Sequence, residues 1–146
     1  MTTTIYFDMD GTIADFYNVN GWLDYLINKD ATPYKVATPL VNPEELAKVL
    51  NELQAKGYRV AIISWLAKNS TPDFDERVTK AKIEWIRKHF ADFWFDEINI
   101  VAHGTPKANY ARTNHDILFD DEIGNRENWC GIAHDVNNIL GVLANL

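Results

Sequence analysis

The sequence predicts an α/β fold with three layers, in which helices cover both faces of a central parallel sheet. Short segments rich in β-branched and aromatic residues alternate with segments whose apolar residues recur at helical spacing. The segment 58–65 is apolar almost throughout, which is typical of a strand buried on both faces of a parallel sheet. These patterns together predict a Rossmann-like arrangement.

Several segments have the length and composition of strands. The first, 2–7, is rich in β-branched and aromatic residues and ends directly before Asp8. The others are predicted at 58–65, 98–101, 116–119 and 131–134. Because helical segments separate several of them, we expect the strands to run parallel.

The clearest helix is predicted between Pro43 and Gly57. Asn42 suits the N-cap, proline suits the first helical position, and glycine can end the helix. Shorter helices are predicted at 20–28 and from Asn137 onward.

Another helix is predicted in the segment that precedes the third strand. Asp73 and Glu76 resemble a capping box at its start. The basic residues at 87–89 favour the negative end of a helix and mark its C-terminus.

Between the first strand and Pro43 lies an insert, 13–41, which we expect to form a small cap on a single domain spanning 1–146. The insert contains a cluster of aromatic residues: Phe16, Tyr17, Trp22 and Tyr25. Such a cluster is more often the core of a small cap than a platform on which bases stack.

The composition favours a globular protein of the cytoplasm. Hydrophobic residues make up 47% of the 146 residues, enough for the core of one domain. The stretch before Ile5 is too short and polar for a signal peptide, and no apolar run approaches the roughly 18 residues of a membrane span. The single cysteine, Cys130, excludes an internal disulfide, and we expect it to be a small buried residue. The formal net charge of −7 argues against a nucleic-acid backbone as the main partner.

Polar residues follow the predicted strands, where an open parallel sheet binds its ligands. These residues are Asp8, Asp10, Ser64, Lys107, Asp120 and Asp121. Carboxylates that converge at one edge repel each other unless a cation compensates, and an all-oxygen set of ligands suits Mg²⁺ better than zinc. We therefore expect Mg²⁺ as the cofactor, with Asp8, Asp10, Asp120 and Asp121 as candidate ligands.

Two of these carboxylates can carry a phosphoryl-transfer reaction. Asp8 can act as the nucleophile, because a carboxylate can accept a phosphoryl group as an aspartyl-phosphate. Asp10 can protonate the leaving oxygen and later deprotonate the attacking water, while its backbone carbonyl reaches the metal.

The remaining site residues are predicted to bind the substrate. Ser64 can donate a hydrogen bond to a phosphoryl oxygen, and Lys107 can balance the charge on the transferring group. Gly11 allows phosphate to approach backbone N–H groups closely. The neighbouring Thr12 and Trp65 are assigned to substrate binding as well.

The segment 8–12, followed by Ser64, Lys107 and the pair Asp120-Asp121, resembles the four motifs of the haloacid dehalogenase-like (HAD) hydrolases across nearly the whole chain. The resemblance implies a HAD-like fold and a Mg²⁺-dependent phosphatase. It also implies that Asp121 contacts the metal directly while Asp120 supports it.

A finer resemblance is to the 5′(3′)-deoxyribonucleotidase group, through the segments 43–57, 82–85 and 117–121. It implies that the substrate is a nucleotide monophosphate. The insert 13–41 is shorter than the multi-helix cap of that group, which leaves the site more open. Such a site admits bulky substrates, or the second subunit of a homodimer covers it.

The predicted function is therefore a phosphomonoesterase acting on a small phosphorylated metabolite, with a (deoxy)nucleotide as one candidate. We expect Tyr17 or Trp22 to contact the leaving group. The alternatives are a phosphatase acting on another metabolite or a nucleic-acid end, and a non-catalytic protein that binds phosphate. A phosphorylated signalling receiver is disfavoured, because the segment 101–104 has no aspartate at the end of the third strand.

Overall fold

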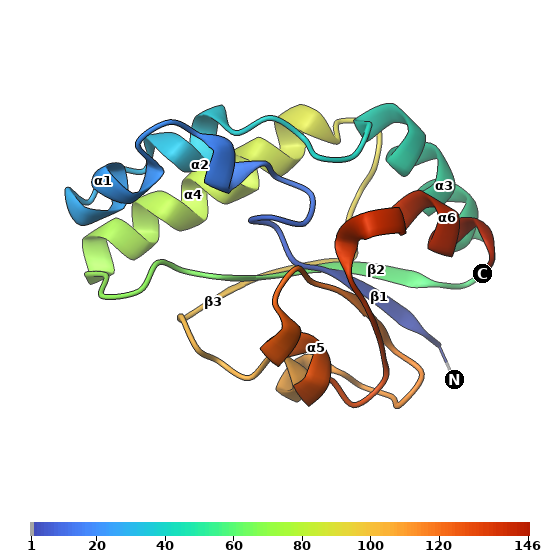
Figure 1. Ribbon diagram of the computed structural model, residues 1–146. Coiled ribbons are helices and arrows are strands. Elements are labelled where there is room, and N and C mark those ends of the chain that lie inside the picture. Colours follow the sequence, from blue (N-terminus) through green and yellow to red (C-terminus); the bar gives the residue numbers. More distant parts are fainter. Residues whose placement is uncertain (1) are drawn as a thin grey trace.

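The computed structural model describes residues 2–146 and contains a five-stranded parallel sheet with the order β3-β2-β1-β4-β5 (Figure 1). The predicted α/β fold class is confirmed. The strands are β1 (Thr4–Phe7), β2 (Arg59–Trp65), β3 (Glu97–Val101), β4 (Ile117–Phe119) and β5 (Ile132–His134). Each lies within one or two residues of its predicted position.

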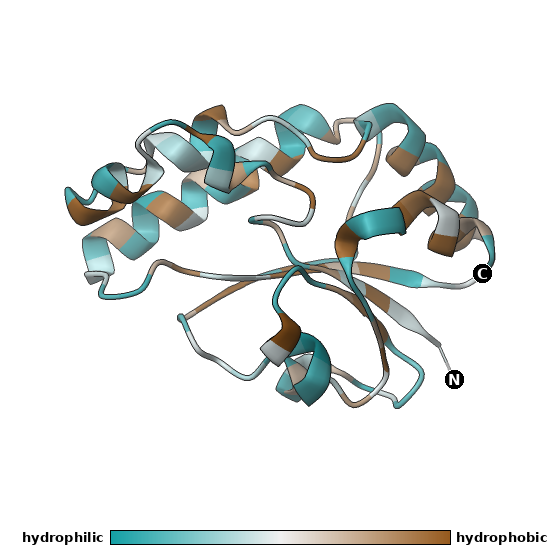
Figure 2. Ribbon diagram, in the orientation of Figure 1, coloured by the Kyte–Doolittle hydropathy of each residue, from teal (hydrophilic) through white to brown (hydrophobic). Residues whose placement is uncertain are grey.

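The central strands are buried on both faces, so their side chains alternate between two cores. Ile5 and Phe7 of β1 belong to the core beneath the longer helices, whereas Tyr6 packs with Trp129 on the opposite face. These three side chains are completely buried. Figure 2 shows the contrast between the largely hydrophobic α6 and the mainly hydrophilic α5.

The two faces are covered unequally. In Figure 1, α3 (Pro43–Ala55), α4 (Pro72–His89) and α6 (Ile139–Ala144) lie above the sheet, together with α1 (Trp22–Ile27) and α2 (Thr32–Val36). The short α5 (Ile123–Asn128) lies below it. The 3-10 helix η2 (Lys107–Tyr110) contacts α5. The three predicted layers are therefore present, and one outer layer is thin.

The start of α3 agrees with the prediction, because the Asn42 side chain accepts a hydrogen bond from the backbone N–H of Glu45 at 3.0 Å. The predicted cap of α4 is wrong. Thr71 is the N-cap and accepts from the backbone N–H of Phe74, so Asp73 already lies in the first turn. Pro72 is the physical reason, since its fixed φ and missing N–H suit the first helical position and place the cap directly before it.

The insert between β1 and α3 consists of the 3-10 helix η1 (Phe16–Asn18), α1 and an unpredicted α2. Phe16 and Tyr34 are buried with residues of α4, among them Phe74. The expectation that the four aromatic side chains form the cap core holds only in part, because Tyr17 is 48% and Tyr25 36% exposed. Tyr34 of α2 is one of the buried residues of this core instead.

The C-terminal region differs from the prediction in three details. The final α-helix starts at Ile139, after a 3-10 turn η3 (Val136–Asn138) that contains the predicted start. Helix α5 was not predicted, because its polar sequence has no apolar stripe. Cys130 is exposed and not buried, since it lies in the surface connection between α5 and β5. Among residues 2–146, no helix combines the length and apolar character needed to cross a membrane.

Candidate active site

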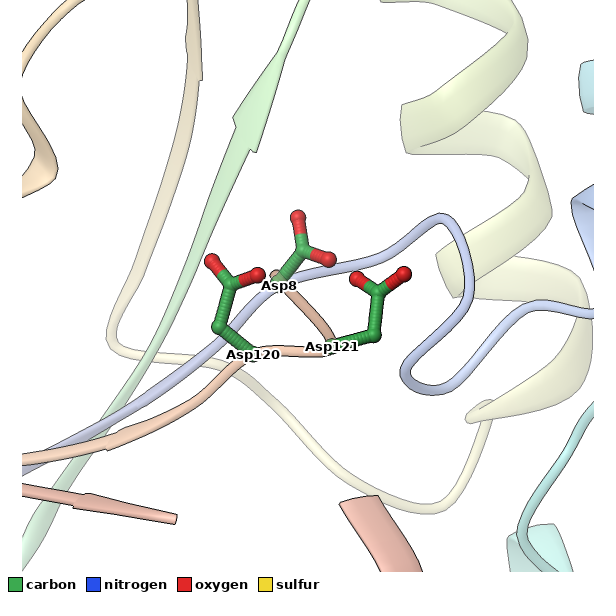
Figure 3. Close-up of side chains that lie close together, drawn as sticks. All are labelled: Asp8, Asp120 and Asp121. Atoms are coloured by element: carbon green, nitrogen blue, oxygen red, sulfur yellow. The ribbon is translucent and has the colours of Figure 1, made fainter. Parts of the chain in front are cut away.

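The site lies at the carboxyl ends of β1 and β4, which are neighbours in the sheet. Asp8 follows β1, and its backbone N–H donates to the carbonyl of Phe119 at 3.0 Å, which continues the pairing with β4. Asp120 and Asp121 follow β4 directly. One carboxylate oxygen from each aspartate lies within 4.8 Å of the others, and the three carboxylates lie side by side in Figure 3.

Lys107, the first residue of η2, joins two of these carboxylates. Its Nζ donates to Asp8 Oδ1 at 2.8 Å and to Asp120 Oδ2 at 2.7 Å, and its side chain is only 2% exposed. Burial alone would lower the pKa of Lys107, but the charges of Asp8 and Asp120 outweigh it and raise the pKa. Lys107 is therefore a cation fixed beside Asp8.

The two adjacent aspartates have different surroundings. Asp120 is fully buried, and its carboxylate accepts from Lys107, from the backbone N–H of Glu122 at 2.9 Å and from Asn125 Nδ2 at 3.1 Å. Asp121 is only partly buried and lines the pocket. Burial and the proximity of Asp8 raise the pKa of both carboxyls. One lysine does not compensate the three aspartates, which is the setting that a divalent cation suits.

The loop after Asp8 fits closely around the carboxylates. Gly11 has a φ of +81°, and a Cβ at this position would lie 2.4 Å from Asp121 Oδ2, so any other residue would displace Asp121. Thr12 is buried, and its hydroxyl donates to Asp8 Oδ2 at 3.0 Å. The structure thus places Thr12 behind Asp8, where it orients that carboxylate, and not in the wall of the pocket.

Asp10 and Ser64 are connected by Lys82, a residue to which the sequence patterns assigned no role. Lys82 Nζ lies 3.0 Å from Asp10 Oδ2 and 2.7 Å from Ser64 Oγ. Burial raises the pKa of Asp10, and Lys82 opposes that effect without cancelling it. A signal was present, because Lys82 stands four residues after Val78 on the apolar stripe of α4, where a charge is unexpected.

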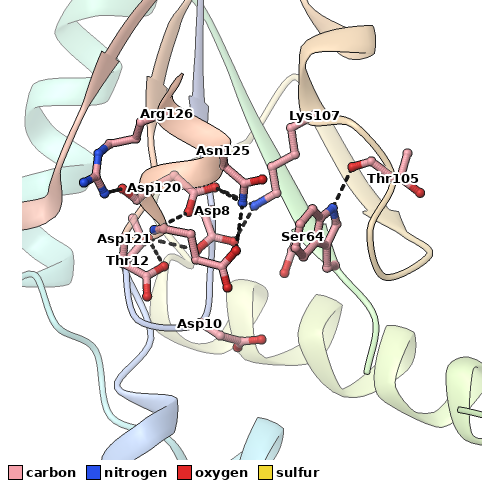
Figure 4. A network of polar contacts seen from close by, with 12 residues as sticks. Asp8, Asp10, Thr12, Ser64, Thr105, Lys107, Asp120, Asp121, Asn125 and Arg126 are labelled. Atoms are coloured by element: carbon pink, nitrogen blue, oxygen red, sulfur yellow. Dashed lines mark hydrogen bonds and ion pairs between the residues drawn. The ribbon is translucent and has the colours of Figure 1, made fainter. Parts of the chain in front are cut away.

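Figure 4 shows how the polar network spans the site, with Lys107 and Asn125 near Asp8 and Asp120, and Asp10 set apart from them. Arg126 donates to the backbone carbonyl of Asp120 at 3.0 Å, which holds the chain at the end of β4. Asn125 and Arg126 both come from α5 and were not predicted as site residues, because that helix was not recognised.

A pocket opens over these residues and has walls from several loops. Asp8, Asp10, Lys107, Asp120 and Asp121 line its polar end. The insert supplies one wall, with Phe16, Tyr17, Trp22, Leu26 and Tyr34. The segment 65–68, His103, Glu122 and Asn125 complete the lining. Among residues 2–146, Ser64 and Gly11 do not line the pocket, although their neighbours Trp65 and Asp10 do.

Trp65 connects two of the loops around the pocket. Its indole N–H donates to the carbonyl of Thr105 at 2.8 Å, and its ring lies 4.9 Å from that of His103. Lys107 Nζ lies 5.3 Å from the centre of the indole ring. Trp65 therefore fixes the loop that carries Lys107 and also forms part of the pocket wall.

No protein-family model and no curated protein sequence matches the chain. Among solved structures, the chain is similar to the D,D-heptose 1,7-bisphosphate phosphatase of Burkholderia thailandensis, with a TM-score of 0.54 and 16% sequence identity. The match covers 86% of this chain and 70% of that one. It supports the Rossmann-like α/β fold expected from the sequence.

Proposed function

We propose that the protein is a Mg²⁺-dependent phosphomonoesterase of the HAD type that acts through an aspartyl-phosphate on Asp8. The arrangement around Asp8 carries the proposal. Its carboxylate lines a pocket, is oriented by Thr12 and Lys107, and lies among further carboxylates. The similarity in fold to a phosphatase is consistent with this function.

In the proposed reaction, an oxygen of Asp8 attacks the phosphorus atom of the ester. The bond between phosphorus and the ester oxygen breaks, its electron pair stays on the leaving oxygen, and the proton of Asp10 passes to that oxygen. Asp10 then takes a proton from a water molecule, which attacks the phosphorus and releases phosphate and free Asp8. Lys107 balances the charge of the transferring group throughout.

The donor set fits Mg²⁺, which prefers carboxylate and carbonyl oxygens. Asp8 and Asp121 would hold the ion with their side chains, because the hydrogen-bonding capacity of Asp120 is largely used by Lys107, Glu122 and Asn125. The Asp10 side chain is bound to Lys82, so its contribution would be the backbone carbonyl. The bound ion would neutralise negative charge on the phosphoryl group.

Turnover of a broad panel of phosphate esters with Mg²⁺, by the wild type and by Asp8→Asn, tests the proposal. The substitution removes the nucleophile but keeps its shape, so we expect turnover to fall by at least about 10³-fold with an unchanged circular dichroism spectrum. Asp24→Asn, on the exposed surface of α1, is the matched control. A wild type that releases no phosphate would contradict the enzymatic function and favour the alternative of a non-catalytic protein that binds phosphate. An active Asp8→Asn would contradict the assignment of Asp8 as the nucleophile.

For the substrate, we propose a small phosphorylated metabolite and a nucleoside monophosphate as the first candidate. The aromatic wall of the pocket, which includes Tyr17, Trp22 and Tyr34, supports a flat apolar leaving group. Comparing mononucleotides, sugar phosphates and oligonucleotide ends at two salt concentrations separates the classes, because only the oligonucleotides should show strong salt dependence. Preference for sugar phosphates would contradict the nucleotide assignment. The cytoplasmic location and the homodimer stay predictions.

A further inference from the structure

Lys82 of α4 is an ammonium group enclosed by the protein. The residue is 1% exposed and ranks among the largest fully buried side chains of the chain. Each of its three N–H groups has a close acceptor: Asp10 Oδ2 at 3.0 Å, Ser64 Oγ at 2.7 Å and the backbone carbonyl of Trp65 at 2.7 Å. Its hydrogen-bonding capacity is therefore filled by the protein itself.

The position of Lys82 also separates it from the substrate. Among residues 2–146, those that line the pocket include Asp10 and Lys107 but not Lys82. The Tyr34 ring of the insert lies 5.0 Å from the ammonium nitrogen. Lys82 thus lies behind Asp10, between the end of β2 and the insert, and acts on the reaction only through the residues that it holds.

The contact with Lys82 determines which carboxyl oxygen of Asp10 can transfer a proton to the leaving oxygen. Oδ2 is bound to Lys82, and within residues 2–146 Oδ1 has no hydrogen-bond donor. Because the carboxyl group is planar, fixing one oxygen at 3.0 Å also fixes the direction of the other. Losing this contact would leave Asp10 free to rotate on a loop that follows β1 by only a few residues.

The contact between Lys82 and Ser64 likewise orients a side chain, here the Ser64 hydroxyl. Lys82 donates to the Ser64 oxygen, which leaves the hydroxyl hydrogen of Ser64 free for another acceptor. A hydroxyl oriented in this way is a donor directed away from α4. One buried cation therefore orients the proton-transfer group Asp10 and a hydrogen-bond donor at the end of β2.

We propose that Lys82 is a positioning residue for proton transfer by Asp10 to the leaving oxygen. The inference rests on the proposed phosphatase function and adds a residue with a defined effect. A merely structural lysine would anchor α4 to the sheet, and its loss would affect all substrates equally. A positioning lysine affects most those substrates whose leaving oxygen needs a proton.

Two aryl phosphates of similar shape provide the test. The 4-nitrophenolate ion leaves readily without a proton, whereas the 4-methylphenolate ion is a much poorer leaving group. In Lys82→Met, which keeps the unbranched stem without the charge, we expect kcat/KM for 4-methylphenyl phosphate to fall about 10²-fold more than for 4-nitrophenyl phosphate. Asp10→Asn should show the same selective loss, which would identify the affected step.

Lys80→Met is the matched control, since Lys80 lies on the same helix with a side chain that is 76% exposed. It should leave both values of kcat/KM unchanged. The ratio of the two values for one variant does not depend on how much of the protein is folded, so partial misfolding of Lys82→Met does not obscure the result. Lys82→Gln is the second variant and should shift the ratio in the same direction.

Equal losses for both substrates, or no loss, would overturn the positioning role while leaving the phosphatase function intact. A wild type that hydrolyses neither aryl phosphate nor any other ester would overturn the proposed function, and the role of Lys82 with it.

Discussion

Asp116 offers a direct test of what holds the two site-bearing strands together. It is fully buried directly before β4, and its Oδ1 accepts from the backbone N–H of Thr4 in β1 at 2.9 Å and from the Thr113 hydroxyl at 2.8 Å. Its Oδ2 accepts from the backbone N–H of Arg112 at 2.8 Å and of Thr113 at 3.2 Å. The substitution Asp116→Asn keeps the shape of this side chain but replaces one acceptor with an NH₂ group.

The expected loss of stability follows from the hydrogen-bond donors that lose their acceptor in Asp116→Asn. If the NH₂ group takes the place of Oδ1, Thr4 loses its acceptor while the Thr113 hydroxyl can turn. If it takes the place of Oδ2, two backbone N–H groups lose theirs. An unsatisfied buried donor costs about 1–3 kcal/mol, so we expect the free energy of unfolding to fall by about 2–4 kcal/mol.

The difference in the free energy of unfolding between the wild type and Asp116→Asn should depend on pH, and the direction of that dependence can be worked out. Burial raises the pKa of Asp116, but the hydrogen bonds from Thr4, Arg112 and Thr113 outweigh it, so the folded-state pKa lies below the usual value. A carboxyl with a lowered pKa stabilises the fold above its unfolded-state pKa, about 3.9, and loses that effect as the pH falls through the folded-state pKa. The gap between wild type and variant should therefore be constant from about pH 7 to pH 5 and shrink below about pH 4.

Urea unfolding followed by tryptophan fluorescence measures the gap, with an unchanged m-value as the sign of two-state behaviour. Asp92→Asn is the control, since Asp92 is exposed and its carboxylate has no hydrogen bond within residues 2–146. A loss of stability in Asp116→Asn no larger than in Asp92→Asn would refute the reasoning, as would a gap that grows on acidification.

Three further predictions concern the site. Gly11→Ala should weaken Mg²⁺ binding measured by calorimetry and reduce turnover, because the new Cβ would lie 2.4 Å from Asp121 Oδ2. Gly57→Ala has the same kind of positive φ with no atom within 4 Å and should only lower stability, by about 1–2 kcal/mol. Mg²⁺ at about 100 times its dissociation constant should stabilise the wild type by about 2.7 kcal/mol, and Asp121→Asn should lose most of the resulting rise in Tm. No rise in the wild type would argue against a metal site. Alanine at both Tyr17 and Trp22, in the pocket wall, should raise KM for aromatic substrates, and unchanged Michaelis constants would exclude contact with the leaving group.

The sequence was sufficient for the sheet and the longer helices, because their patterns reflect local physics. The apolar run that forms β2 and the Asn42-Pro43 start of α3 appear in the structure where they were predicted. Short elements without an apolar stripe, such as α2 and α5, were missed. They are stabilised by contacts with distant parts of the chain, as in the cluster of Tyr34 with Phe74, which no local pattern reveals.

The sequence by itself determined that Asp8, Lys107, Asp120 and Asp121 would meet, since the ends of parallel strands share one edge of the sheet. Only the tertiary structure decided how the individual side chains are used. It turned the Thr12 hydroxyl toward Asp8 and enclosed Lys82 behind Asp10. The first contact lies within one loop, and the second joins segments brought together by packing. The geometry of both depends on the depth of each side chain, which spacing along the chain does not specify.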